Sequence, residues 1–238
     1  MLRRPRWLVG TVICLLLAAL FVSLGLWQLR RLDERQARND LVESRMDLPV
    51  VDVLAADGPL EYRRVSAEGR YDPAGEVLVR ARSLNEAPGR WVLTPLVLDD
   101  DSAVLVNRGF VPNEVDVPAA PSGPQRIEGI LRATEERGSF GPRDPAEGTL
   151  AELARADIAR VQGQYDRPLF PLYLQRLSDT EPGTELPVVL PAPELDEGPH
   201  LGYAVQWFLF AGVGLVGWPI LLRRTAKERD EDDVVLAA

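Results

Sequence analysis

The sequence contains very few of the side chains on which enzyme and metal chemistry usually depends. Among 238 residues there is one cysteine, Cys14, and one histidine, His200. A single cysteine excludes an intramolecular disulfide and a zinc site built on several cysteines, and no Cys-x-x-Cys-His haem-attachment motif is present. A single histidine allows a Ser-His-Asp triad at only one place, and there is no glycine-rich phosphate-binding loop. These absences argue against an enzyme.

The chain also lacks the positive charge of a nucleic-acid-binding protein. Its formal net charge is -9 at pH 7, and its sequence pI is about 4.8. A surface that binds a phosphate backbone needs an excess of lysine and arginine. We therefore exclude nucleic acid as a partner, and the length of the chain allows one or two domains.

Two long stretches contain no charged residue. The first runs from Trp7 to Gln28 and the second from Leu201 to Leu222. About 20 residues at ~1.5 Å rise cross the ~30 Å apolar core of a bilayer, so we predict transmembrane helices at 7–28 and 200–222. A secretory signal would also begin near the N-terminus, but its apolar region is shorter and ends in a small-residue cleavage site. We therefore predict that the first span is uncleaved.

The charges that flank the second span predict its orientation. Arg223, Arg224, Lys227 and Arg229 follow it, whereas 185–200 contains neither lysine nor arginine. The positive-inside rule then places the acidic tail 223–238 in the cytoplasm. The charges around the first span are ambiguous, but two spans put the N-terminal residues 1–6 on the same side as the tail. Residues 29–199 would lie outside the cell membrane.

The segment between the spans predicts a β-rich domain. A charged helical pattern continues the first span to Met46, and short apolar runs broken by glycine and proline follow from Tyr62. Alternation predicts strands at Glu76–Arg82, Arg90–Leu98, Ala103–Phe110, Arg126–Arg132 and Pro171–Leu177. Asp99–Asp101 would form a hairpin turn, and Asn107–Phe110 would end a strand in a tight turn that uses the freedom of Gly109.

One helix is predicted within this domain, at Thr149–Gly163. Thr149 and Glu152 match a capping box, and apolar residues recur at helical spacing after them. The whole segment is large enough for its own core. The predicted fold class is a membrane protein with two transmembrane helices flanking a β-rich (α+β) extracytoplasmic domain, a small antiparallel barrel or sandwich with one or two helices.

Several short motifs follow one another along the chain. In order they are Leu24-Gly25-Leu26-Trp27-Gln28-Leu29-Arg30-Arg31-Leu32, Tyr62-Arg63-Arg64-Val65, Gly69-Arg70-Tyr71, Thr94-Pro95-Leu96, Leu105-Val106-Asn107-Arg108-Gly109-Phe110-Val111-Pro112, Gly129-Ile130-Leu131-Arg132 and His200-Leu201-x-Tyr203-Ala204-x-Gln206-Trp207-Phe208. Together they resemble the Surfeit-locus (Surf-one, Shy-one) family of cytochrome c oxidase assembly factors. Two positions depart from the family pattern: Gly198 replaces an asparagine, and Glu147-Gly148-Thr149-Leu150 lacks an asparagine and a tryptophan.

The resemblance implies a chaperone of the respiratory chain rather than an enzyme. Such proteins help to insert haem a into subunit I of an aa3-type oxidase, and bacterial members are thought to bind haem a themselves. The implied neighbours are oxidase subunit I, haem A synthase and the lipid bilayer. Two alternatives stay open: a structural scaffold that stabilises a half-built oxidase without binding haem, and an enzyme of haem modification, which the lack of further histidines and cysteines disfavours.

His200, Tyr203 and Trp207 are the candidate haem a contacts. On a helix they share one face, which would offer an imidazole ligand for the iron and two rings for the porphyrin. The alternative is an amphipathic anchor at the membrane surface. Arg108 is a candidate for a haem propionate, since arginine binds carboxylates in a bidentate manner, but arginines on strands commonly face water.

The two spans are expected to pack against each other. Thr11, Cys14, Ala18 and Gly25 form a stripe of small residues that permits close approach. Polar side chains in spans usually face other helices, so Gln206 is expected to bond across to the first span, or else to contact another subunit.

Overall fold

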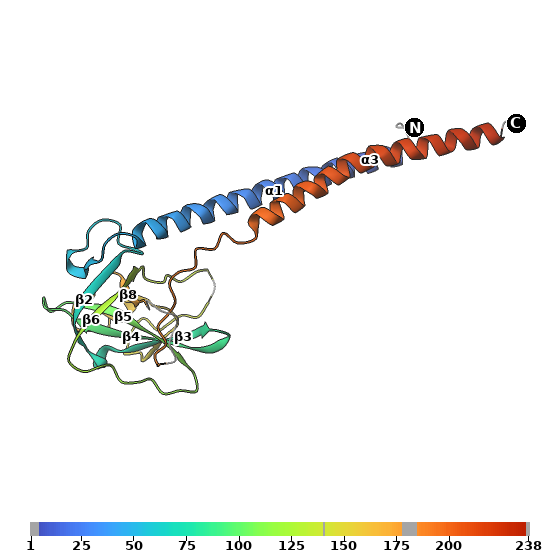
Figure 1. Cartoon of the computed structure of the whole chain (residues 1–238). Helices are drawn as coiled ribbons and strands as arrows, with labels where there is room; N and C mark the ends of the chain where they lie inside the picture. The colour runs from blue at the N-terminus through green and yellow to red at the C-terminus, as the bar shows by residue number, and fades with distance from the viewer. Residues whose placement is uncertain (1–4, 140, 178–184, 237–238) are drawn as a thin grey trace. The chain divides into compact units, whose positions relative to one another are not determined.

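The computed structural model describes residues 5–139, 141–177 and 185–236, and the chain divides into two units. The helical unit contains helix α1 (Pro5–Met46) as far as Leu41 and helix α3 (His200–Leu236), while the β unit contains residues 42–194 (Figure 1). Both helices are long and apolar enough to cross a membrane, over Trp7–Met46 and His200–Lys227. Two long apolar helices therefore flank a β-rich unit, which confirms the predicted fold class.

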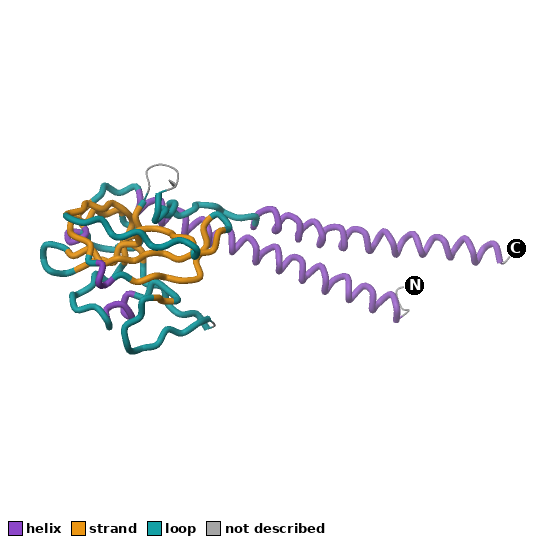
Figure 2. The backbone as a smooth tube through the Cα atoms, turned by 90° about the horizontal axis from the view of Figure 1, so that it is seen from below, coloured by secondary structure: helices purple, strands orange, loops and turns teal. Residues whose placement is uncertain are grey.

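The β unit is built on one mixed sheet of eight strands (Figures 1 and 2). The strands are β1 (Val51–Asp52), β2 (Arg64–Tyr71), β3 (Val77–Leu84), β4 (Ala87–Val97), β5 (Ala103–Pro112), β6 (Pro124–Arg132), β7 (Glu152–Leu153) and β8 (Tyr173–Arg176). Short helices lie at Val53–Ala55 (η1), Pro73–Gly75 (η2) and Ile158–Gln162 (α2).

Five of these strands close into a ring. The sheet runs β2-β6-β8-β5-β4, and a further antiparallel pairing of β2 with β4 joins its two ends. Strand directions cannot alternate around a ring with an odd number of strands, so at least one neighbouring pair must be parallel. That pair is β5 and β8. The predicted antiparallel barrel is thus present with one parallel pair.

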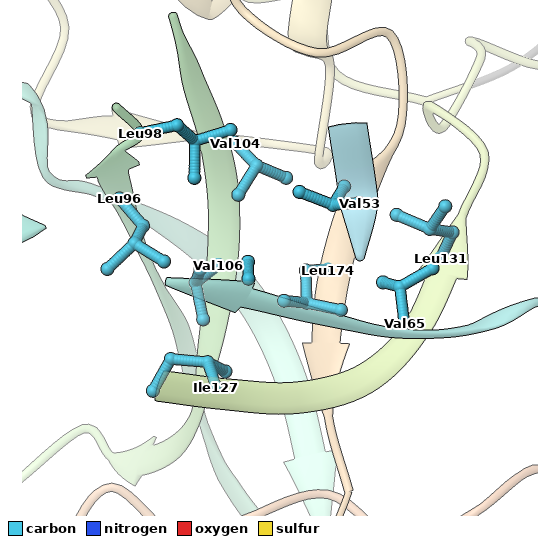
Figure 3. Close-up of a cluster of buried hydrophobic side chains, with 10 residues drawn as sticks. Val53, Val65, Leu96, Leu98, Val104, Val106, Ile127, Leu131 and Leu174 are labelled. Carbon is cyan, nitrogen blue, oxygen red and sulfur yellow. The ribbon is translucent and has the colours of Figure 1, made fainter. Parts of the chain in front are cut away.

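The interior of the ring is apolar (Figure 3). The side chains that fill it come from every strand of the ring and from η1: Val53, Val65, Ala67, Leu96, Leu98, Val104, Val106, Ile127, Leu131 and Leu174. Leu105 points to the opposite face of β5, where α2 and β7 cover a second cluster. Strand β5 is therefore buried on both faces, which explains its nearly continuous apolar sequence.

The helix predicted at Thr149–Gly163 was wrong over most of its length. Glu152 and Leu153 form β7, which pairs in parallel with β3, and the only helix in this segment is α2, which begins at Ile158. The backbone N–H of Ala154 donates to both oxygens of Asp144, at 3.0 and 2.8 Å, so it is not available for a helical hydrogen bond. The N-cap is instead Asp157, which accepts from the N–H of Arg160 at 3.0 Å.

The tight turn predicted at Asn107–Phe110 was also wrong, because β5 continues to Pro112. Asn107 pairs with Leu93 and Gly109 with Val92, so Arg108 is an extra residue in a β-bulge. Gly109 has φ +138, and its backbone lies against the carbonyl of Val188. The freedom of Gly109 is therefore used, although for a bulge and a close approach rather than for a turn.

Replacing Gly109 by alanine should destabilise the β unit by about 3 kcal/mol. A Cβ at this position would collide with the Val188 carbonyl, in addition to the strain of a positive φ. The matched control is Gly123→Ala, since Gly123 has φ +83 but open space around it; it should cost only about 1 kcal/mol. Calorimetric unfolding of the full-length protein in detergent measures both, and equal losses would contradict the steric account.

The buried Tyr173 predicts that the β unit loses stability in alkali. Burial raises the pKa of Tyr173 from 10.0 to about 12. The unfolded chain therefore ionises first, and stability that is complete below pH 10 should be lost as the pH rises towards 12. Tyr173→Phe should lose about 2 kcal/mol less than the wild type over this range, as measured by urea unfolding at each pH. If the free energies of unfolding of the two proteins fell by equal amounts over this pH range, the prediction would be refuted.

Candidate functional site

Helices α1 and α3 pack side by side and antiparallel within the helical unit (Figure 2). Their contact surface combines small residues that admit rings of the other helix with aromatic residues that stack on one another. A Cβ on Gly25 would lie 2.7 Å from the ring of Phe208. Cys14 donates through Sγ to the carbonyl of Gly214 at 3.4 Å. The predicted small-residue stripe is therefore confirmed as a packing surface.

Contacts between the two helices fall at intervals of three, four and seven residues along α1. The contacting pairs, from the N-terminus of α1, are Thr11 with Trp218, Cys14 with Gly214, Phe21 with Trp207, Gly25 with Phe208 and Gln28 with His200. This is the spacing of a left-handed coiled coil. The spacing fixes the rotation of α3 and so decides which of its side chains face α1.

Aromatic rings occupy the middle of this contact. The ring of Trp207 stacks on Phe21, with centroids 5.6 Å apart and planes inclined by 25°, and meets Phe210 edge-on at 5.9 Å. Beside them is an apolar cavity of about 290 Å³, floored by Gly10, Cys14, Ala18 and Gly214. Trp207 thus has one face against Phe21, which immobilises its ring.

His200 is the first residue of α3 and is half-buried. Its Nδ1 lies 2.8 Å from Oε1 of Gln28, a residue 172 positions earlier in the chain. Gly198 has φ +71, and its N–H donates to the carboxylate of Asp196 at 2.9 Å. Glycine and asparagine tolerate this left-handed conformation best. The replacement of the family's asparagine by Gly198 therefore keeps a residue that suits this backbone conformation.

The other candidate residues on α3 have different surroundings. Tyr203 is 48% exposed, so its ring is open to the surroundings of the helix. Gln206 is exposed as well and forms no hydrogen bond within the described part of the chain. The prediction that Gln206 bonds across to the first span was therefore wrong; the glutamine that bonds across the two helices is Gln28, to His200. Gln28 belongs to the motif Leu24–Leu32, but helical spacing within α1 cannot reveal a partner on another helix.

Arg108 belongs to the β unit and is only 2% exposed. It forms an ion pair with Glu76 at 2.9 Å and donates to the carbonyls of Pro118 and Ala119 at 3.0 Å. The guanidinium also lies 5.8 Å from the ring of Tyr71. These contacts anchor the loop after β5, and the prediction that Arg108 meets a propionate stays a prediction.

Comparison with known proteins identifies relatives over most of the chain. The model of the SURF1 family matches residues 15–212. An uncharacterised SURF1-like protein of Mycobacterium bovis is 30% identical over 230 residues, which cover 91% of this chain and 83% of the relative. A SURF1-like protein of Rickettsia bellii is 26% identical, covering 86% and 87%. Surfeit locus protein 1 of Takifugu rubripes is 31% identical, covering 56% and 65%.

The helix packing predicts a specific cross-link. A Cβ on Gly214 would lie 4.0 Å from Sγ of Cys14, so Gly214→Cys should form a disulfide with the single native cysteine after mild oxidation in membranes. Gly217→Cys is the control, because nothing lies within 4 Å of a Cβ there. Proteolysis between the spans, followed by non-reducing electrophoresis, detects the link. Equal cross-linking at both positions would contradict this register.

Proposed function

Because this chain belongs to the SURF1 family, whose members are linked to cytochrome oxidase assembly, we propose that it is an assembly factor that carries haem a to subunit I of an aa3-type oxidase. The carriage is transient, so the protein is a chaperone of the cofactor rather than an enzyme. The observation that carries the proposal is the setting of His200, the only histidine, at the start of an apolar helix.

The residues around His200 fit a haem. A neutral imidazole is a common axial ligand of haem iron. One nitrogen of His200 is engaged by Gln28, while the edge that carries the other is adjacent to Gly198, which has no side chain. Tyr203, one turn along, is exposed and able to lie against a porphyrin. Trp207, the third candidate, stacks on Phe21 within the helix pair.

The amphipathic character of haem a suits a ligand at a membrane boundary. Its long apolar tail would lie along the spans in the bilayer, and its propionates would point to the water outside the membrane. This arrangement requires both termini in the cytoplasm and the β unit outside, as the basic residues after Leu222 favour. Oxidase subunit I and haem A synthase are the expected partners.

One observation favours the alternative of a scaffold that binds no haem. The exposed face of α3 carries Gln206, and glycines at 202 and 217 have nothing within 4 Å of a Cβ. Small residues and a polar side chain in a span are typical of a surface that packs on another transmembrane helix. A contact there would stabilise a half-built oxidase whether or not haem is carried.

The haem proposal is tested by replacing His200. His200→Ala protein, purified from cells that make haem a, should lose most of the haem absorbance seen with the wild type, because its iron ligand is gone. Gln206→Leu is the control on the same helix and should retain it. Full haem absorbance in His200→Ala would refute ligation by His200.

Deleting the gene separates carriage from scaffolding. Membrane spectra that show assembled oxidase lacking haem a at one site would support delivery, whereas loss of the whole complex would support the scaffold. Normal haem a peaks and normal oxidase activity in the deletion strain would refute both functions.

A further inference from the structure

The contact between Gln28 and His200 determines which nitrogen of the imidazole is free to bind iron. We propose that Gln28 is a positioning residue whose amide oxygen accepts a hydrogen bond from Nδ1–H of His200 and so leaves Nε2 as the unprotonated, ligating nitrogen. The tautomer is a property of the protein alone. The assignment of Nε2 as iron ligand rests on the proposed function.

The packing of the helices holds both partners in place. Gln28 lies one turn beyond Gly25 on α1, and Gly25 packs directly against the ring of Phe208 on α3. His200 lies at the start of α3, where the N–H of Tyr203 donates to the carbonyl of Pro199 at 3.1 Å. Neither side chain therefore has to be ordered at the moment when a ligand arrives, which lowers the entropic cost of binding.

The chemistry of the two groups sets the tautomer. A neutral imidazole has one N–H and one lone pair, and a carbonyl oxygen can only accept. The nitrogen 2.8 Å from Oε1 of Gln28 must therefore carry the proton, which leaves the lone pair on Nε2. Metal-binding histidines almost always donate their second N–H in this way to a carboxylate, a carbonyl or water.

The partner is a neutral amide, although two carboxylates lie close by in the sequence. Asp196 accepts from the N–H of Gly198, and Glu197 accepts from Nε2 of Gln36 at 3.0 Å, so both are engaged elsewhere. A carboxylate would draw the proton of His200 more strongly and make the imidazole a more basic ligand. An amide orients the ring without making the imidazole more basic, and a less basic ligand suits a protein that must later release its haem.

The edge of the ring that carries Nε2 faces Gly198, which adds no side chain there. A Cβ at this position would lie 3.5 Å from Nε2 and 3.4 Å from Cδ2. A side chain at position 198 would therefore be in ordinary van der Waals contact with this edge of the imidazole. Gln28 thus engages Nδ1, while glycine at position 198 places no side-chain atom beside Nε2.

The tautomer can be observed directly, because the chain has a single histidine. Full-length protein labelled with ¹⁵N-histidine, without haem, in nanodiscs at about pH 8, should give one imidazole with a protonated Nδ1 and an unprotonated Nε2. Gln28→Leu should lose this preference, and Gln206→Leu should keep it. A protonated Nε2 in the wild type, or an unchanged spectrum in Gln28→Leu, would overturn the proposal.

Haem titration tests the consequence for the ligand. Gln28→Leu should weaken haem a binding by about 10- to 100-fold, the usual effect of removing the hydrogen-bond partner of a metal-binding histidine. Gln28→Glu should retain the tautomer, bind at least as tightly, and shift the midpoint potential of the bound haem to a more negative value. A merely structural role for Gln28 would leave that potential unchanged.

The outcomes separate this inference from the proposed function. If the wild type shows the Nδ1–H tautomer but binds no haem a, haem carriage and the iron-ligand part of the inference are both refuted, and the orienting role of Gln28 stands. If haem binding requires His200 but is as tight in Gln28→Leu as in the wild type, the inference fails and haem carriage stands.

Discussion

The close packing of α1 against α3 is the constraint on which the candidate site depends. Small residues on α1 admit the large rings of α3, so the two backbones approach closely and the rotation of each helix is fixed. Within a bilayer the apolar effect contributes little to such an association, because lipid chains are as apolar as the side chains they replace. Shape complementarity and the few available hydrogen bonds must therefore provide the stability. The bond between Gln28 and His200 lies at one end of this packed surface.

The β unit follows a different principle, since it is organised around the doubly buried strand β5. One face of β5 fills the interior of the ring, and the other is covered by α2 and β7. The bulge at Arg108 allows this strand to carry a buried guanidinium, whose charge is balanced by Glu76 and by two carbonyls. A buried arginine without such partners would destabilise the unit considerably.

The sequence predicted the features that depend on local patterns. Charge-free runs identified both long helices, and alternation located five strands of the β unit within a few residues of their observed bounds. Strand β2 was not assigned, although its residues lay in two recognised motifs. Its inner face is apolar at Val65, Ala67 and Tyr71 but is interrupted by Gly69, and this weakens the alternating pattern. The failed helix at Thr149–Gly163 depended on Asp144, whose bond to the N–H of Ala154 is a contact that periodicity cannot reveal.

The candidate site shows the same limit. Helical spacing placed His200, Tyr203 and Trp207 on neighbouring turns, but it could not say which face of α3 meets α1. The position of Gln206 on the outer face and the role of Gln28 both follow from that rotation. Similarly, the freedom of Gly109 was foreseen, whereas the bulge depends on how β5 is registered against β4.

The distance along the chain between Gln28 and His200 has a consequence for biosynthesis. Gln28 is made early and His200 near the end, with 172 positions separating the two residues. The imidazole cannot be oriented until translation has passed the whole β unit and the last helix has been inserted beside the first. A truncated or half-inserted chain would therefore lack the bond between Gln28 and His200, and its imidazole would stay unoriented.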